Sequence, residues 1–193
     1  MIFEKERTQV AQIMRRLYER GLTTMSGGNV SFKNTEGYIF ITASQTDKSC
    51  IDESKIVVLD NTLETLTPEL KPSMETGMHL KIYEKRPDIS AIVHAHPVFA
   101  STFAVSNIQL DTFITDEAGY ILGEIAVIEH KTMGSNELAK ACSEGLTKYN
   151  VGLMRNHGAI AVGSNLTEAF DRMEVLEFTA RIYFNSLVLG NRG

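Results

Sequence analysis

The stretch AIVHAH, residues 91–96, constrains the fold more than any other part of the sequence. Its continuous apolar start, with Pro87 before it and Pro97 after it, predicts a buried β-strand. Residues i and i+2 of a strand point to the same face, so we expect His94 and His96 to project their imidazoles together. Two neutral imidazoles at this spacing can share one metal ion, although two polar residues at a strand end explain so short a motif equally well.

A third histidine strengthens the metal hypothesis. His157 lies in the sequence NHG between two short apolar strands that we expect within 151–163. Taken alone, His157 could equally be a turn residue with a solvated ring. Three histidines with an open fourth position describe a catalytic zinc site, whereas structural zinc sites are usually rich in cysteine. Cobalt, manganese or iron could occupy the same ligands.

Helical and strand patterns alternate along the rest of the chain. Apolar periodicity predicts helices at 4–20, 74–86, 98–105 and 136–149, and a long final helix that begins at a Thr167 cap. Further strands are expected at 29–33, 38–42, 55–60 and 124–130. Because several strands pair locally as hairpins, we expect an α/β/α sandwich around a mixed, largely antiparallel sheet. No linker or repeat interrupts the pattern, so residues 1–193 are expected to form one domain.

Composition narrows the function classes. The formal net charge of -5 provides no basic field, which argues against nucleic acid as a partner. No apolar run approaches the ~20 residues of a membrane span, and the charged N-terminal stretch lacks a secretory h-region. The two cysteines, Cys50 and Cys142, stand far apart without a pairing pattern, as in a reduced intracellular protein. We therefore expect a cytoplasmic chain with no membrane partner.

An acidic residue opens the second expected helix, in KPSMETGMHL at 71–80. Glu75 lies in its first turn, where the helix dipole alone could explain a carboxylate. His79, four residues later, shares that helical face, and we expect it to pack there or to support the site from behind. His130 has no evident partner and is expected at the surface or an interface.

A glycine turn, GGNVS at 27–31, precedes the first expected strand. Glycines allow the backbone to approach a ligand and to present N–H groups to an anion, although a plain strand-entry turn is the simpler explanation. Asn29, Ser44 and Ser73 are polar side chains that could converge on the same anion.

Read in chain order, these motifs no longer look independent. They are GGNVS, ITASQTDKS, KPSMETGMHL, RPDISAIVHAHP, EAGYILGEIAVI and RNHGAIAVG. Over essentially the whole chain this series resembles the class II aldolase/adducin family, and within it the L-fuculose-1-phosphate aldolase-like enzymes. The resemblance implies an α/β/α fold and a homotetramer with active sites between neighbouring subunits.

The same resemblance assigns roles to residues. It implies that zinc is held by His94, His96 and His157, and that Glu75 is the catalytic acid/base. It places the phosphate-binding pattern on Gly28, Asn29, Ser44 and Ser73.

The sequence departs from the family pattern at several positions. Gln45 stands where the phosphate loop usually has glycine, and Met74 replaces a second serine. Lys48 is a nearby basic residue to which no role is assigned. The segment 111–123 matches the one from which a neighbouring subunit donates a tyrosine; its candidate residues here are Thr115, Asp116, Glu117 and Tyr120. The chain also ends soon after its last helix, which implies that the C-terminal tail of longer members is missing.

The implied activity is reversible cleavage of a ketose 1-phosphate, similar to L-fuculose 1-phosphate, to dihydroxyacetone phosphate and an aldehyde. It would proceed through a zinc-stabilised enediolate, with Glu75 moving the proton. A pentulose 5-phosphate 4-epimerase, or an aldolase or decarboxylase of acid-sugar phosphates, would use the same ligands. A non-enzymatic adducin-like module would be expected to have lost them, and this chain keeps all three histidines and the glutamate.

Overall fold

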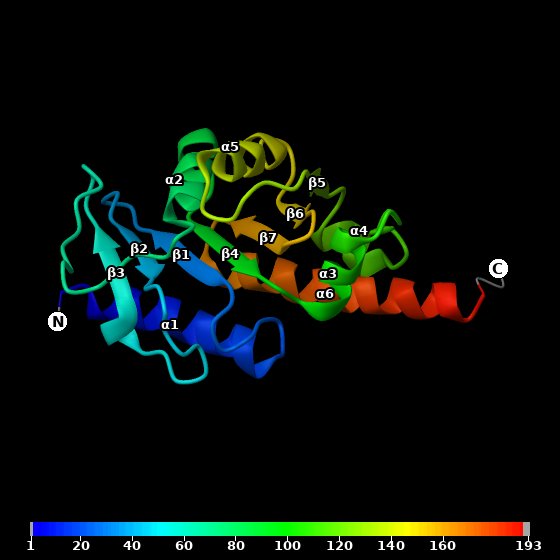
Figure 1. The fold of residues 1–193 in the computed structure, drawn as a ribbon, viewed down its shortest axis with the longest axis horizontal. Coiled ribbons are helices and arrows are strands. Elements are labelled where there is room, and N and C mark those ends of the chain that lie inside the picture. Colours follow the sequence, from blue (N-terminus) through cyan, green and yellow to red (C-terminus); the bar gives the residue numbers. More distant parts are fainter. Residues whose placement is uncertain (1, 191–193) are drawn as a thin grey trace.

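Seven strands form one mixed sheet through the middle of the molecule (Figure 1). The chain is described by a computed structural model that covers residues 2–190. In chain order the strands are β1 (Asn29–Lys33), β2 (Ile39–Thr42), β3 (Ile56–Leu59), β4 (Ala91–Ala95), β5 (Ala126–Ile128), β6 (Val151–Met154) and β7 (Gly158–Gly163). Across the sheet the order is β3-β2-β1-β4-β7-β6-β5, and the neighbouring strands are antiparallel except for the parallel pair β5 and β6. The predicted mixed, largely antiparallel sheet is confirmed.

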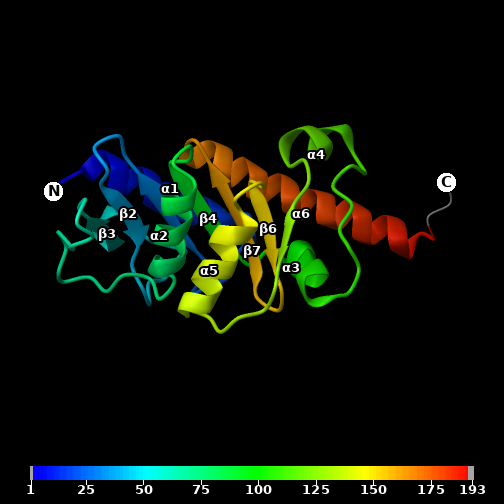
Figure 2. The same cartoon turned by 90° about the horizontal axis from the view of Figure 1, so that it is seen from above.

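Helices cover both faces of this sheet. The described residues contain α1 (Glu4–Glu19), α2 (Thr76–Lys85), α3 (Val98–Val105), α4 (Asp116–Ile121), α5 (Asn136–Gly145) and α6 (Leu166–Val188), and a 3-10 turn at Glu53–Lys55. Figures 1 and 2 show α2 and α5 side by side on one face, with α1 and the long α6 on the other. Each face encloses its own apolar cluster. The chain is therefore a single-domain α/β/α sandwich, as expected.

Alternation along the central strands decides which residues face which helices. In β4, Val93 packs into the cluster beneath α1 and α6, whereas Ile92 packs into the cluster beneath α2 and α5. His94, two residues after Ile92, shares the α2 face because strand side chains alternate. In the neighbouring β1, Val30 belongs to the α6 side, so Asn29 and Ser31 also face α2. Polar residues of two paired strands, His94 of β4 and Asn29 and Ser31 of β1, thus face the same helix.

Helix ends match the predictions at some positions and differ at others. Helix α1 stops at Gly21, whose φ of 68° and bond to the Tyr18 carbonyl form a Schellman motif together with the bond from Leu22 N–H to the Leu17 carbonyl. The predicted Thr167 cap of the last helix is wrong, because the side chain of Asn165 caps α6 by accepting a hydrogen bond from Glu168 N–H at 2.9 Å.

Two other helices also differ from the prediction. Helix α5 ends at Gly145 rather than at 149, and α4 was not predicted at all. A helix of six residues is too short to carry an apolar period. Among the described residues, no helix is both long and apolar enough to cross a membrane.

Candidate active site

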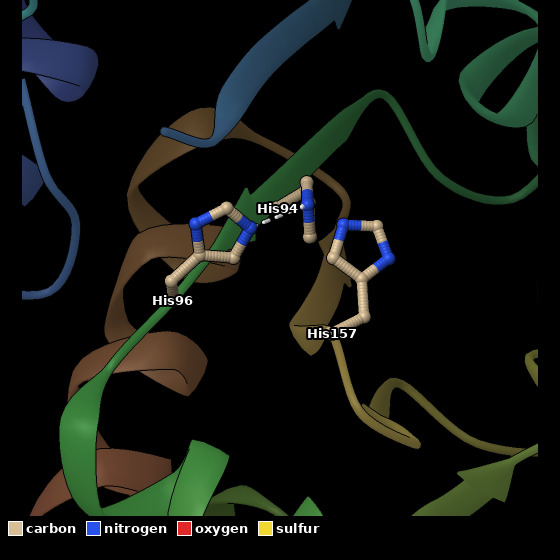
Figure 3. Close-up of side chains that lie close together, drawn as sticks. All are labelled: His94, His96 and His157. Carbon is tan, nitrogen blue, oxygen red and sulfur yellow. Dashed lines mark hydrogen bonds between the residues drawn. The ribbon is translucent and has the colours of Figure 1, made fainter. Parts of the chain in front are cut away.

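Three histidines converge at the end of the central strands. His94 lies near the end of β4, His96 directly follows that strand, and His157 lies in the turn between β6 and β7. One ring nitrogen from each lies within 4.8 Å of the others, and His94 Nε2 is 3.2 Å from His96 Nε2. Figure 3 shows the three rings turned toward one another. These residues form a group that could bind a metal ion.

The orientation of His94 is set by the sheet. Its ring lies fully buried, and Nδ1 is 2.9 Å from the carbonyl oxygen of Ala159 on β7, so Nδ1–H donates and Nε2 points toward the other two rings. Ala159 is the cross-strand partner of Ala95, one residue along β4. A backbone carbonyl that fixes the tautomer of a ligating imidazole is a common arrangement around metals.

Burial and neighbouring charges keep two of the three rings in the neutral form. Burial lowers the pKa of His96 to about 4, helped by the charge on His94. The same two causes lower the pKa of His157 to about 4. Burial acts against a charge on His94 as well, but the Glu75 carboxylate outweighs it and raises the pKa of His94. At neutral pH His96 and His157 are therefore uncharged, which is the form that binds metal.

Glycines leave the space that His96 occupies. A Cβ on Gly27 would lie 2.7 Å from His96 Nδ1, and a Cβ on Gly158 would lie 2.6 Å from His96 Cδ2. Gly28 has a φ of 68°, and a Cβ there would meet the His94 carbonyl oxygen at 2.7 Å. The glycine turn at 27–28 therefore packs directly against His94 and His96.

Glu75 reaches the histidines from the start of α2. It is the N-cap residue rather than part of the first turn, and its side chain makes no capping bond to the helix. Instead, Oε2 accepts a hydrogen bond from Asn29 Nδ2 at 2.9 Å and lies 3.1 Å from His94 Nε2, while Oε1 is 3.4 Å from His157 Nε2. Burial would raise the pKa of Glu75, but the His94 ring and the Asn29 amide hold it well below its usual range. The side chain is therefore a buried carboxylate.

The donor set fits a divalent metal. Within residues 2–190, His157 Nε2 and Glu75 Oε1 are buried without a hydrogen-bond partner, a rare condition for buried polar atoms. A cation between the rings would give both atoms a partner. Two nitrogens bound to one tetrahedral zinc ion are separated by about 3.3 Å, since each Zn–N bond is roughly 2.0–2.1 Å long. The 3.2 Å between His94 Nε2 and His96 Nε2 is close to that value.

A chain of buried polar groups continues from Glu75 into the protein. Asn29 Oδ1 is 2.5 Å from His79 Nε2, and His79 Nδ1 is 2.7 Å from Ser31 Oγ. Ser31 Oγ is 2.8 Å from the Tyr83 hydroxyl, which also donates to the Ser90 carbonyl at 3.3 Å. The expected supporting position of His79 is therefore seen. The roles of Ser31 and Tyr83 were missed, although a serine at an inward-facing strand position is a signal in the sequence.

Two further predicted residues, Ser73 and Ser44, lie on segments that contact each other near the start of α2. Ser73 Oγ accepts a hydrogen bond from Glu75 N–H at 3.3 Å. Ser44 N–H donates to the Lys71 carbonyl at 2.9 Å, and the preceding residue forms an isolated bridge with Pro72. The loop that carries Ser44 is therefore held against the segment that carries Ser73. Gln45, which replaces the family's glycine, adopts a φ of 55° in this loop.

The remaining candidates lie in different surroundings, on α4, at the surface and in the interior. Thr115 caps the short α4, and Tyr120 on that helix is 92% exposed. His130 is exposed, as expected, but its charge contributes to the lowered pKa of His157, so it lies in the neighbourhood of the three rings. Lys48 is buried, with its ammonium 3.4 Å from the Ala43 carbonyl oxygen.

The chain matches known proteins over nearly its whole length. Residues 8–184 match the family described as Class II Aldolase and Adducin N-terminal domain. The 5-deoxy-D-ribulose 1-phosphate aldolase of Bacillus thuringiensis serovar kurstaki is 34% identical over 98% of this chain and 89% of its own length. A 3-oxo-tetronate 4-phosphate decarboxylase of Haemophilus influenzae is 30% identical over 91% of this chain and 85% of its own.

The fold also matches that of a solved structure. An L-fuculose 1-phosphate aldolase superposes with a TM-score of 0.90 at 32% identity, covering 98% of this chain and 90% of that one. Sequence and fold thus match the same group of proteins over nearly the full length. The chain belongs to the class II aldolase and adducin family.

Proposed function

We propose that this protein is a zinc-dependent lyase that cleaves a ketose 1-phosphate to dihydroxyacetone phosphate and an aldehyde. The observation that carries the proposal is the convergence of three imidazoles beside a buried carboxylate with an unsatisfied oxygen. Relatives named as aldolases of two sugar 1-phosphates support it. An adducin-like module without catalysis would have no need of such a site.

The histidines would hold the ion, and His94, His96 and His157 are the proposed ligands. When bound, zinc supplies Lewis-acid polarisation of the ketone and stabilises the negative charge of the enediolate. Gly28, Asn29, Ser44 and Ser73 are the proposed phosphate-binding residues. The side-chain amide of Asn29 already bonds to Glu75 and His79, so part of this residue is committed to holding the carboxylate.

Glu75 is the proposed acid and base at the carbon that reacts. In cleavage the bond between C3 and C4 breaks, its electron pair stays on C3, and the C4 hydroxyl passes its proton to the Glu75 carboxylate as the aldehyde forms. Glu75 then delivers a proton to C3, which completes dihydroxyacetone phosphate. In the direction of synthesis the carboxylate removes the same proton. The ionised form of Glu75 at neutral pH is the one that this second step requires.

A decarboxylase is the second candidate. The Haemophilus influenzae relative is named for decarboxylation of a 3-oxo acid phosphate, which also passes through an enolate. Thr115 stands where the resemblance expects a tyrosine from the neighbouring subunit, so any proton transfer that uses the phenol of that tyrosine would need another group here. We further propose a cytoplasmic homotetramer with active sites between subunits, which sedimentation equilibrium would test.

The test is a cleavage assay on protein of known metal content. A panel of fuculose, rhamnulose, 5-deoxyribulose and fructose 1-phosphates is coupled to detection of dihydroxyacetone phosphate, and 3-oxo-tetronate 4-phosphate is followed by release of carbon dioxide. We expect one zinc ion per chain and turnover of at least one ketose 1-phosphate. EDTA and Glu75→Gln should each abolish it, the second without loss of zinc.

Two results would change the proposal. Carbon dioxide release without aldol cleavage would transfer the function to the decarboxylase. Protein that purifies without zinc and does not bind it would support a non-enzymatic module.

A further inference from the structure

The buried polar groups behind Glu75 form one continuous series. It runs from Glu75 through Asn29, His79 and Ser31 to Tyr83, with heavy-atom separations of 2.9, 2.5, 2.7 and 2.8 Å. Each of the five residues is at most 5% exposed. The series crosses between β1 and α2, where apolar side chains would otherwise fill the space. Packing alone does not require polar side chains at these buried positions, and burying them is costly unless they are hydrogen-bonded.

The carboxylate at one end fixes the direction of every hydrogen bond. Ionised Glu75 can only accept, so Asn29 must turn its amide nitrogen toward Glu75 and its oxygen toward His79. His79 Nε2 must then carry the proton and donate, which leaves Nδ1 as an acceptor for the Ser31 hydroxyl. The Tyr83 hydroxyl can in turn donate to Ser31 Oγ or to the Ser90 carbonyl.

A neutral His79 is required by this arrangement, and its surroundings favour one. The ring is fully buried, and burial lowers the pKa of His79 to about 3. A protonated ring would donate from both nitrogens and would force Ser31 to accept from it. The neutral ring instead accepts from Ser31 and donates to Asn29, which in turn donates to Glu75. All three hydrogen bonds therefore run in the same direction, toward the carboxylate, and they polarise one another.

We propose that His79 is a positioning residue, which holds the Asn29 amide in the orientation that fixes the Glu75 carboxylate beside the three histidines. The proposal rests on the proposed function of Glu75 and assigns that site a supporting residue that touches neither substrate nor metal. Without His79, Asn29 can rotate, and the Glu75 carboxylate loses the hydrogen bond from Asn29, the one that residues 2–190 supply to it from outside the histidine group.

Four variants test this role. His79→Leu removes the donor while keeping an apolar side chain, and His79→Gln keeps an amide that can donate to Asn29 and accept from Ser31. Tyr83→Phe cuts the far end of the series, and Ile82→Val is a control at a buried position of the same helix. Each protein is measured for zinc content, thermal unfolding, kcat and KM on the best ketose 1-phosphate.

The expected pattern separates positioning from simple packing. His79→Leu should lower kcat about 10- to 100-fold, as supporting residues around metal sites typically do, with zinc content retained and KM changed by no more than about twofold. His79→Gln should recover most of that loss, and Tyr83→Phe should lose about two- to fivefold. Unchanged kcat in His79→Leu overturns the proposal, as does a glutamine variant no better than leucine or a loss of zinc.

One measurement needs neither a substrate nor a variant. Nitrogen-15 NMR of histidine-labelled wild-type protein reports the tautomer of each ring. We expect His79 as the neutral Nε2–H form, with that proton shifted far downfield by the short bond to Asn29. An Nδ1–H or doubly protonated ring overturns the proposal. If the wild-type protein cleaves no ketose 1-phosphate, the proposed function fails, and the NMR result still decides the orientation of the series.

Discussion

Gly158 is a residue at which a single methyl group reaches the candidate metal site. A Cβ there would lie 2.6 Å from His96 Cδ2 and 2.6 Å from the Ala95 carbonyl oxygen, so either the ring or the turn must move. We expect Gly158→Ala to weaken zinc binding at least about tenfold, in line with other changes behind metal ligands. Competition with a chromophoric chelator measures this affinity.

A matched glycine provides the control. Gly77 lies in the first turn of α2 and is exposed, and a Cβ added there would meet no atom within 4 Å. Gly77→Ala should leave zinc affinity unchanged and raise the free energy of unfolding by up to about 1 kcal/mol, because alanine loses less backbone entropy in a helix. Equal zinc affinity in the two alanine variants would contradict the close approach of Gly158 to His96.

Lys48 allows a prediction about pH. Burial lowers the pKa of its ammonium from 10.5 to about 8. Between these two pH values the unfolded chain binds more protons at Lys48 than the folded chain does. The free energy of unfolding therefore decreases as the pH falls from about 10.5 to about 8. Lys48→Met should therefore raise the free energy of unfolding at pH 7 by on the order of 1–2 kcal/mol, and by less at pH 10.

Urea unfolding at the two pH values measures the effect. Lys148→Met, at an exposed position, is the control and should show no such gain. A lower free energy of unfolding for Lys48→Met at pH 7 would show that interactions of the ammonium in the fold outweigh the cost of burying it.

At the scale of elements, the sequence predicted the helices and strands that depend on neighbouring residues. The continuous apolar start of 91–96 identified β4, strand alternation gave the shared direction of His94 and His96, and the apolar spacing of 4–20 identified α1. The strand order could not be read in this way, because the pairing of Asn29 with His94 joins distant parts of the chain. Without that register, nothing in the sequence shows that Ser31 lies beneath His79. Glu75 was identified by resemblance, not by spacing.

The start of α6 illustrates how local patterns can mislead. Both Asn165 and Thr167 are residue types that cap helices, and the structure uses Asn165. Asn165→Ala should lower the free energy of unfolding by about 1 kcal/mol, since the Glu168 N–H loses its acceptor. Thr167→Ala, at an exposed position, should change it by less than about 0.5 kcal/mol. Urea midpoints of the two variants compare them, and the reverse ranking would restore Thr167 as the cap.

For the whole molecule, we expect the fold to survive removal of the metal. His94 is oriented by the Ala159 carbonyl and by strand pairing, neither of which needs an ion. EDTA should leave the far-ultraviolet circular dichroism unchanged. Zinc at 100 times its dissociation constant should add about 2.7 kcal/mol, and hence raise Tm by roughly 5–10 °C. Loss of the helical signal in EDTA would indicate instead that the ion is needed for folding.

The place of His157 in the chain also sets an order of events during synthesis. Glu75, His94 and His96 leave the ribosome together with β1 to β4, whose mutual pairings are complete by residue 95. The third imidazole arrives much later in the chain, on a turn that β7 must first bring alongside β4. A nascent chain therefore carries its carboxylate and two of its histidines before it can hold an ion with all three imidazoles. We therefore expect tight metal binding only after synthesis has passed His157 and β7 has paired with β4.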